Sequence, residues 1–144
     1  MATSLASPVI RASAGVRIGS YLIDMLPTFL LLPIAWIPFI GQLIGGLVLF
    51  LYWLSRDAFG RSLGKKLLGL SISTADGAAP STGSLVLRNL PNALPWLLYM
   101  IPLAGYVILA GANFFILLTE IILLISSNSR LGDRIAGTVV TAGN

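Results

Sequence analysis

The sequence contains no cysteine and no histidine, and charged residues make up only 10% of its 144 residues. Without cysteine there are no disulfides and no thiol chemistry, and without both residues the usual ligands of zinc and haem are missing. Ser-His-Asp and Cys-His sets are excluded too, so we expect neither an acyl-transfer enzyme nor any other enzyme, and no cofactor. Soluble domains carry about 25% charged residues, so this chain is short of charge.

What the chain has in abundance is apolar surface. Hydrophobic residues make up 56% of it, and its mean hydropathy is +0.92. A chain long enough for one domain cannot hide that much apolar surface from water, so we expect residues 1–144 to form a single membrane domain in a lipid bilayer. The formal net charge is +4. Because the basic residues lie beside apolar segments, we attribute them to membrane orientation and expect no nucleic-acid partner.

Two long blocks of the chain are almost free of charge. The block between Asp24 and Arg56 has no charged residue, and the block between Arg88 and Arg130 has only Glu120. Crossing the hydrocarbon takes about 20 helical residues, and each block is too long for a single span. Each is therefore expected to form a hairpin of two helices.

Prolines and an interfacial tryptophan place the reversals. Pro33 and Pro38 flank a four-residue segment with Trp36, and residues 102–111 form the second turn. The expected fold is all-α, with four transmembrane helices as two hairpins, short interfacial helices and a small β-ribbon. The expected helices are 14–32, 39–54, 84–101 and 107–126, and the expected cytoplasmic loop is 55–83.

The distribution of positive charge supports two hairpins. With two hairpins, all nine lysines and arginines lie on one side of the membrane, whereas two long helices would divide them. Positive residues favour the cytoplasmic side, so we expect a multi-pass protein with both termini in the cytoplasm. The nine residues are Arg11, Arg17, Arg56, Arg61, Lys65, Lys66, Arg88, Arg130 and Arg134.

Similar sequences follow the two hairpins, at residues 63–73 and 131–141. Each reads Leu-Gly, two charged residues, two apolar residues, Gly and then a β-prone run. We expect each copy to form a short interfacial helix that stops at its glycine, followed by a strand that pairs with the other copy. The two halves would then be parallel repeats. Lys65 aligns with Asp133, and we expect these two side chains to form an ion pair.

A polar stripe lies on the first apolar segment. Arg17, Ser20, Tyr21, Asp24 and Thr28 have spacings that share one helix face. A carboxylate within a membrane helix is costly and is often functional. Asp24 is therefore either a proton or cation site, or a structural carboxylate partnered by Arg17 and Tyr21.

A second membrane acid lies in the last apolar segment. Asn113, Glu120 and Ser127 are seven residues apart and share one helix face. At 1.5 Å per residue, Glu120 lies about 15 Å from Arg130, near the bilayer midplane. We expect no basic partner at that depth and hence a protonated acid. It would either exchange protons or hydrogen-bond across a helix interface.

The order of these motifs resembles the RDD family of small membrane proteins. That family is named for an Arg at the start of the first helix, an Asp within it and a second Asp near the end, which match Arg17, Asp24 and Asp133. Further matching text is Ser62-Leu-Gly-Lys-Lys-Leu-Leu-Gly69, Arg88-Asn89 and Arg130-Leu-Gly-Asp133-Arg134-Ile-Ala-Gly-Thr-Val-Val140. The resemblance implies a bacterial inner-membrane protein. It also implies transport, with some members reported as sodium/proton antiporters.

Two functions remain open. The first is a monovalent cation/proton exchanger, working as a homo-oligomer, with Asp24 as the site for a cation or proton and Glu120 as a second site. The second is a membrane scaffold or assembly factor that does not transport, whose basic cytoplasmic face binds anionic lipid or a protein partner. The residues expected to support the site are Arg17, Ser20, Tyr21, Lys65, Arg88, Asn113, Arg130 and Asp133.

Overall fold

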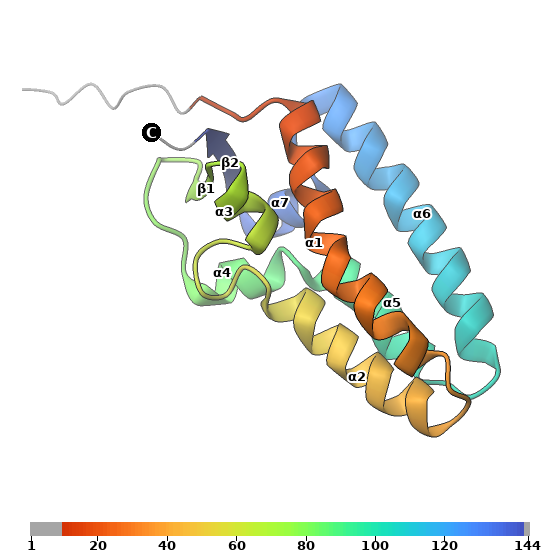
Figure 1. The fold of residues 1–144 in the computed structure, drawn as a ribbon. Helices are drawn as coiled ribbons and strands as arrows, with labels where there is room; N and C mark the ends of the chain where they lie inside the picture. Colours follow the sequence, from red (N-terminus) through yellow and green to blue (C-terminus); the bar gives the residue numbers. More distant parts are fainter. Residues whose placement is uncertain (1–9, 143–144) are drawn as a thin grey trace, which may run out of the picture.

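Four apolar helices run between two tight turns at one end of the molecule and a group of short elements at the other (Figure 1). The structure is a computed structural model, and it describes residues 10–142. The elements of this part are α1 (Ala14–Ala35), α2 (Ile40–Ser55), α3 (Leu63–Leu67), β1 (Leu70–Thr74), α4 (Thr82–Leu87), α5 (Leu90–Tyr99), α6 (Ala104–Ser127), α7 (Leu131–Ala136) and β2 (Thr138–Ala142).

The two hairpins reverse at the same end, which we call the turn end (lower right in Figure 1). Phe39 and Leu103 have φ angles of 61° and 63°. The next residue of each turn donates a backbone hydrogen bond to a proline carbonyl, over 2.9 Å to Pro38 and 2.7 Å to Pro102. The first turn is where the sequence predicts it. The second is shorter than predicted, because α6 begins at Ala104.

All nine basic residues lie toward the other end, which we call the basic end. They occur before or within the first turns of α1, between α2 and α5, or after α6. This arrangement agrees with the paired hairpins inferred from charge. Helices α3 and α7 and the two strands lie at this same end (Figure 1).

The expected single helix 84–101 is divided into α4 and α5 at Arg88 and Asn89. Pro91 is the second residue of α5 and has no N–H for a bond to the preceding turn, so a continuous helix would be interrupted there. The break leaves α5 with 10 residues. The other three expected helices are present, with ends shifted by up to three residues.

Helix α5 is in contact with α2 and α6, and α1 packs against α2. The core between them includes Leu49, Trp53, Trp96 and Tyr99. The Tyr99 hydroxyl donates a 2.6 Å hydrogen bond to the Ala35 carbonyl. This bond ties the first hairpin to the second near the turn end.

Among the described residues, α1 and α6 are the helices long and apolar enough to cross a membrane. Helix α2 is apolar but has only 16 residues. Many large apolar side chains face outward, as with Leu30, which is 80% exposed. Lipid would cover such a surface at little cost, whereas water would not. The fold is therefore that of a mostly helical membrane protein, while four complete spans are not confirmed.

The predicted β-ribbon is confirmed. Strands β1 and β2 pair antiparallel, with Ile72 opposite Val140. The glycines that precede them, Gly69 and Gly137, both have a φ of 63°, a left-handed conformation that ends a helix. The ribbon joins the two halves of the chain at the basic end.

Candidate functional site

The polar stripe lies on one face of α1, as the sequence predicts, and most of it is buried. Arg17, Ser20, Asp24 and Thr28 are each at most 4% exposed. Tyr21 on the same face is partly exposed. The stripe faces the loops and helices of the basic end, so its polar groups find partners within the protein.

Asp24 is held by the segment that begins α3. One carboxylate oxygen accepts a 2.7 Å hydrogen bond from the Ser62 hydroxyl, and the other accepts a 2.7 Å bond from the Gly64 N–H. The Arg56 guanidinium lies 3.6 Å away. The expected partnership with Arg17 is wrong, because the loop after α2 folds back onto α1 and places Ser62 and Gly64 against Asp24.

Arg17 instead forms an ion pair with Asp133. Arg88 pairs with the other oxygen of the same carboxylate, and the Arg130 N–H donates to it over 3.2 Å. The expected Lys65–Asp133 pair is therefore wrong. Equivalent positions of a repeat need not face each other. Asp133 lies at the start of α7, which packs against α4, and there it meets Arg88.

Lys65 pairs with Asp57. Its ammonium lies 2.8 and 3.1 Å from the two carboxylate oxygens and 3.0 Å from the Ser62 hydroxyl. Asp57 is fully buried. Burial alone would raise the pKa of Asp57, but the charges of Lys65, Arg56 and Arg88 outweigh it and hold this pKa well below its ordinary value. Asp57 thus stays ionised.

Glu120 has a basic partner, contrary to expectation. The Arg130 Nε atom donates a 2.6 Å hydrogen bond to one oxygen of Glu120. The distance along a continuous helix misled the prediction, since the chain turns back at Asn128, where φ is 47°. The other oxygen of Glu120 is buried and has no hydrogen-bond partner.

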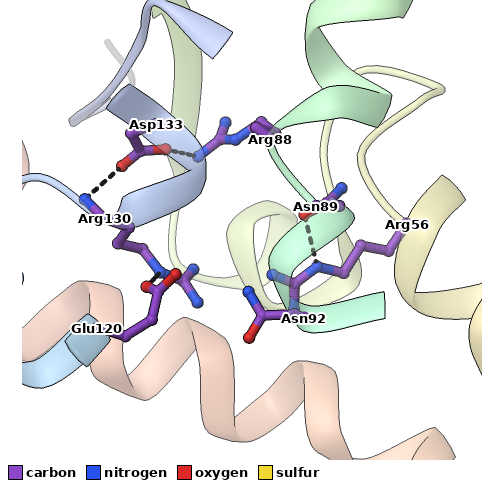
Figure 2. Close-up of a pocket in the computed structure, with 7 residues that line it drawn as sticks. All are labelled: Arg56, Arg88, Asn89, Asn92, Glu120, Arg130 and Asp133. Atoms are coloured by element: carbon purple, nitrogen blue, oxygen red, sulfur yellow. Dashed lines mark hydrogen bonds and ion pairs between the residues drawn. The ribbon is translucent and has the colours of Figure 1, made fainter. Parts of the chain in front are cut away.

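Figure 2 shows how these side chains meet. Arg130 and Arg56 approach from opposite sides, toward the space above Asn92. Both guanidinium groups lie close to the Tyr21 ring, at 4.9 and 5.5 Å from its centroid. Arg56 also donates a 3.1 Å bond to the Asn89 side chain. The space is tightly packed, with no room for a water molecule.

A large cleft adjoins this polar cluster. It has a volume of about 570 Å³. Residues of α1 form one wall and residues of α6 the other, with Trp53 and Trp96 also lining it. Arg17, Glu120 and Arg130 lie at its charged end, and Asn113 lines it farther along α6. As predicted, Asn113 and Glu120 share a face.

Sequence reasoning did not single out three participants of this network: Arg56, Asp57 and Ser62. The sequence did contain a signal that could have found Asp57: it has only five acidic residues against nine basic ones. Buried charges need partners, so every acid near the basic end was a candidate. The loop position of Asp57 hid its burial.

Comparison with known proteins gives one family. The model of the RDD family matches residues 11–137, which is most of the chain. No curated protein and no solved structure matches it.

Proposed function

The chain belongs to the RDD family, and from that premise we propose that it is a monovalent cation/proton exchanger of the bacterial inner membrane. The group that exchanges the ion or proton is Glu120. The observation that supports this proposal most is the placement of Glu120 on a membrane-type helix, beside a large cleft, with one buried oxygen that has no hydrogen-bond partner.

The chemistry of the pair fits an exchange site. Arg130 and a bound cation would compete for the same carboxylate, and a proton would neutralise it and weaken its hold on Arg130. A cation and a proton that compete for the Glu120 carboxylate bind in alternation, as antiport requires. Asn113, on the same face of α6 and in the same cleft, adds an amide oxygen for a cation.

Asp24 is better placed to hold the fold than to bind an ion. Both of its oxygens already accept hydrogen bonds from the α3 segment. An ion would have to displace at least one of these buried donors, which is costly. Its assignment as a cation site therefore stays a prediction, secondary to Glu120.

Reconstitution tests the exchanger. The protein is placed in liposomes with a pH-sensitive dye inside, and sodium, potassium or lithium gradients are imposed. We expect proton movement driven by at least one cation, and its loss in Glu120→Gln, with Asp76→Asn as the matched control because Asp76 is an exposed acid in the turn after β1. Circular dichroism and size-exclusion chromatography confirm that both variants fold.

The absence of proton movement under every gradient would rule out the exchanger function. The membrane scaffold would then be the better-supported function. The Asp24 carboxylate favours it, because its hydrogen bonds hold α1 to the segment that begins α3. In that case the basic end would recruit anionic lipid or a protein partner. Binding of the protein to vesicles with and without anionic lipid would then be measured. Equal binding would exclude a scaffold that recruits anionic lipid.

A further inference from the structure

We propose that the cleft between α1 and α6 holds one acyl chain of an anionic phospholipid, whose phosphate lies against Arg17 and Arg130. The inference concerns a resident lipid and does not depend on ion exchange. It rests on the shape of the cleft, on the charge at one end of it and on the acids of the chain.

The shape suits a chain-like apolar ligand that enters from the bilayer. The cleft of about 570 Å³ falls within the roughly 300–1,000 Å³ of ligand sites. Its walls are mainly apolar, with Met25 and Phe29 on α1 facing Leu117 and Ile121 on α6. Both walls belong to the helices that are long enough to cross a membrane. An opening between such helices meets lipid tails rather than water.

The charge lies at one end of the cleft, as a lipid requires. Its charged lining residues are Arg17, Glu120 and Arg130. They belong to the buried network in which five basic side chains face four carboxylates, so one positive charge is in excess. Arg17 is 4% exposed, and its buried Nε has no hydrogen-bond partner. A phosphate oxygen at this position would satisfy that donor and balance the charge. The apolar part of the ligand would then extend along the cleft toward the turn end.

A second copy of the chain fits the same cleft less well. The chain has five acidic residues. Four of them are buried in the network at the basic end, and Asp76 lies in the exposed turn after β1. A helix of another copy would therefore bring apolar surface to the cleft but no anion to Arg17. An anionic lipid supplies both.

Tryptophan fluorescence reads the occupant directly. The chain has three tryptophans; Trp53 and Trp96 line the cleft, and Trp36 lies exposed at the turn end. In a Trp36→Phe background, the protein is placed in bilayers with increasing fractions of phosphatidylglycerol or phosphatidylcholine, each brominated on the acyl chains. One unit of charge near the membrane surface favours anionic lipid about fivefold. We therefore expect half-maximal quenching at a fraction of phosphatidylglycerol about fivefold lower than that of phosphatidylcholine.

A matched pair of substitutions places the lipid in the cleft. Leu117 lines the cleft and Leu118 does not, although both are about half exposed, at 49% and 45%. Leu117→Phe narrows the cleft and should reduce quenching by brominated phosphatidylglycerol, whereas Leu118→Phe should leave it unchanged. Equal effects of the two substitutions would mean that lipid merely surrounds the protein, and would overturn the proposal.

The head-group end is tested without leaving a buried charge unpaired. Arg17→Gln removes the excess positive charge while Asp133 keeps its ion pair with Arg88, and it should lower the preference for phosphatidylglycerol. The exposed Arg61→Gln should not. Equal quenching by the two lipids in the parent protein would overturn the proposal. So would crosslinking between copies of the Leu117→Cys variant, because it would assign the cleft to a second copy. Since no ion gradient is used, these outcomes are independent of the exchanger assay.

Discussion

At the scale of single residues, the carboxylates of this protein are held by loops that fold back onto the helices. Asp24 on α1 is bound by the segment that begins α3, and Asp133 on α7 is bound by Arg17 and Arg88. The sequence predicts which residues share a helix face, because helix spacing is regular. It does not predict which loop side chain reaches that face. This is why the shared face of the stripe is confirmed, while the partners expected for Asp24 and Lys65, and the expected lack of a basic partner for Glu120, are wrong.

The buried acids make stability depend on pH. Burial opposes ionisation of Asp133 and Asp57, but the surrounding cations outweigh it and lower the pKa of each below its ordinary value. The folded state therefore binds fewer protons than the unfolded state in mild acid. Their contribution is complete above the ordinary pKa of an aspartate, about 3.9, and is lost as the pH falls below it toward the lowered values.

We therefore expect the melting temperature in detergent to fall by several degrees between about pH 6 and about pH 3. Differential scanning fluorimetry on tryptophan emission measures it. Asp76→Asn serves as the control and should keep the same slope, because Asp76 lies in an exposed turn. A melting temperature that does not change over this range would show that the ion pairs contribute nothing to stability.

At the scale of elements, the repeat predicted the short helices and the ribbon, and the structure shows why its glycines recur. A Cβ atom on Gly64 would lie 2.0 Å from the Ser20 carbonyl oxygen, and one on Gly132 would lie 1.7 Å from that of Arg88. Each short helix thus packs its glycine against the backbone of the helical segment that starts its half. The break between α4 and α5 was not predicted, because the apolar residues on both sides of Arg88 and Asn89 were interpreted as one helix although these two polar residues and Pro91 mark the break.

This close approach predicts that Gly64→Ala and Gly132→Ala are strongly destabilising. Each methyl group would collide with backbone, which cannot move aside as a side chain can, at a cost of about 1–3 kcal/mol or more. Gly111→Ala is the matched control, since nothing lies within 4 Å of the added Cβ. In the middle of α6 it should be neutral or stabilise by up to about 1 kcal/mol. Unfolding in mixed micelles measures all three, and equal stability of the three variants would contradict the packing.

At the scale of the whole molecule, the lengths of the helices decide how they can cross the bilayer. Helices α1 and α6 are long enough, whereas α5, with 10 residues, would reach only about half of a hydrocarbon core near 30 Å thick. Both hairpins nevertheless turn at one end, and all nine basic residues lie toward the other. This polarity favours a membrane placement in which the turns face outward and the basic end faces the cytoplasm.

The absence of cysteine allows a direct test of that placement, because any introduced thiol is unique. Trp36→Cys and Ile101→Cys mark the two turns, and Arg61→Cys and Asp76→Cys mark the basic end. In intact cells an impermeant maleimide should label both turn positions and neither basic position. After permeabilisation it should label all four. Labelling of basic and turn positions from the same side would show that the hairpins do not cross the membrane. Labelling of Trp36→Cys without labelling of Ile101→Cys would show that the turn between α5 and α6 stays within the membrane.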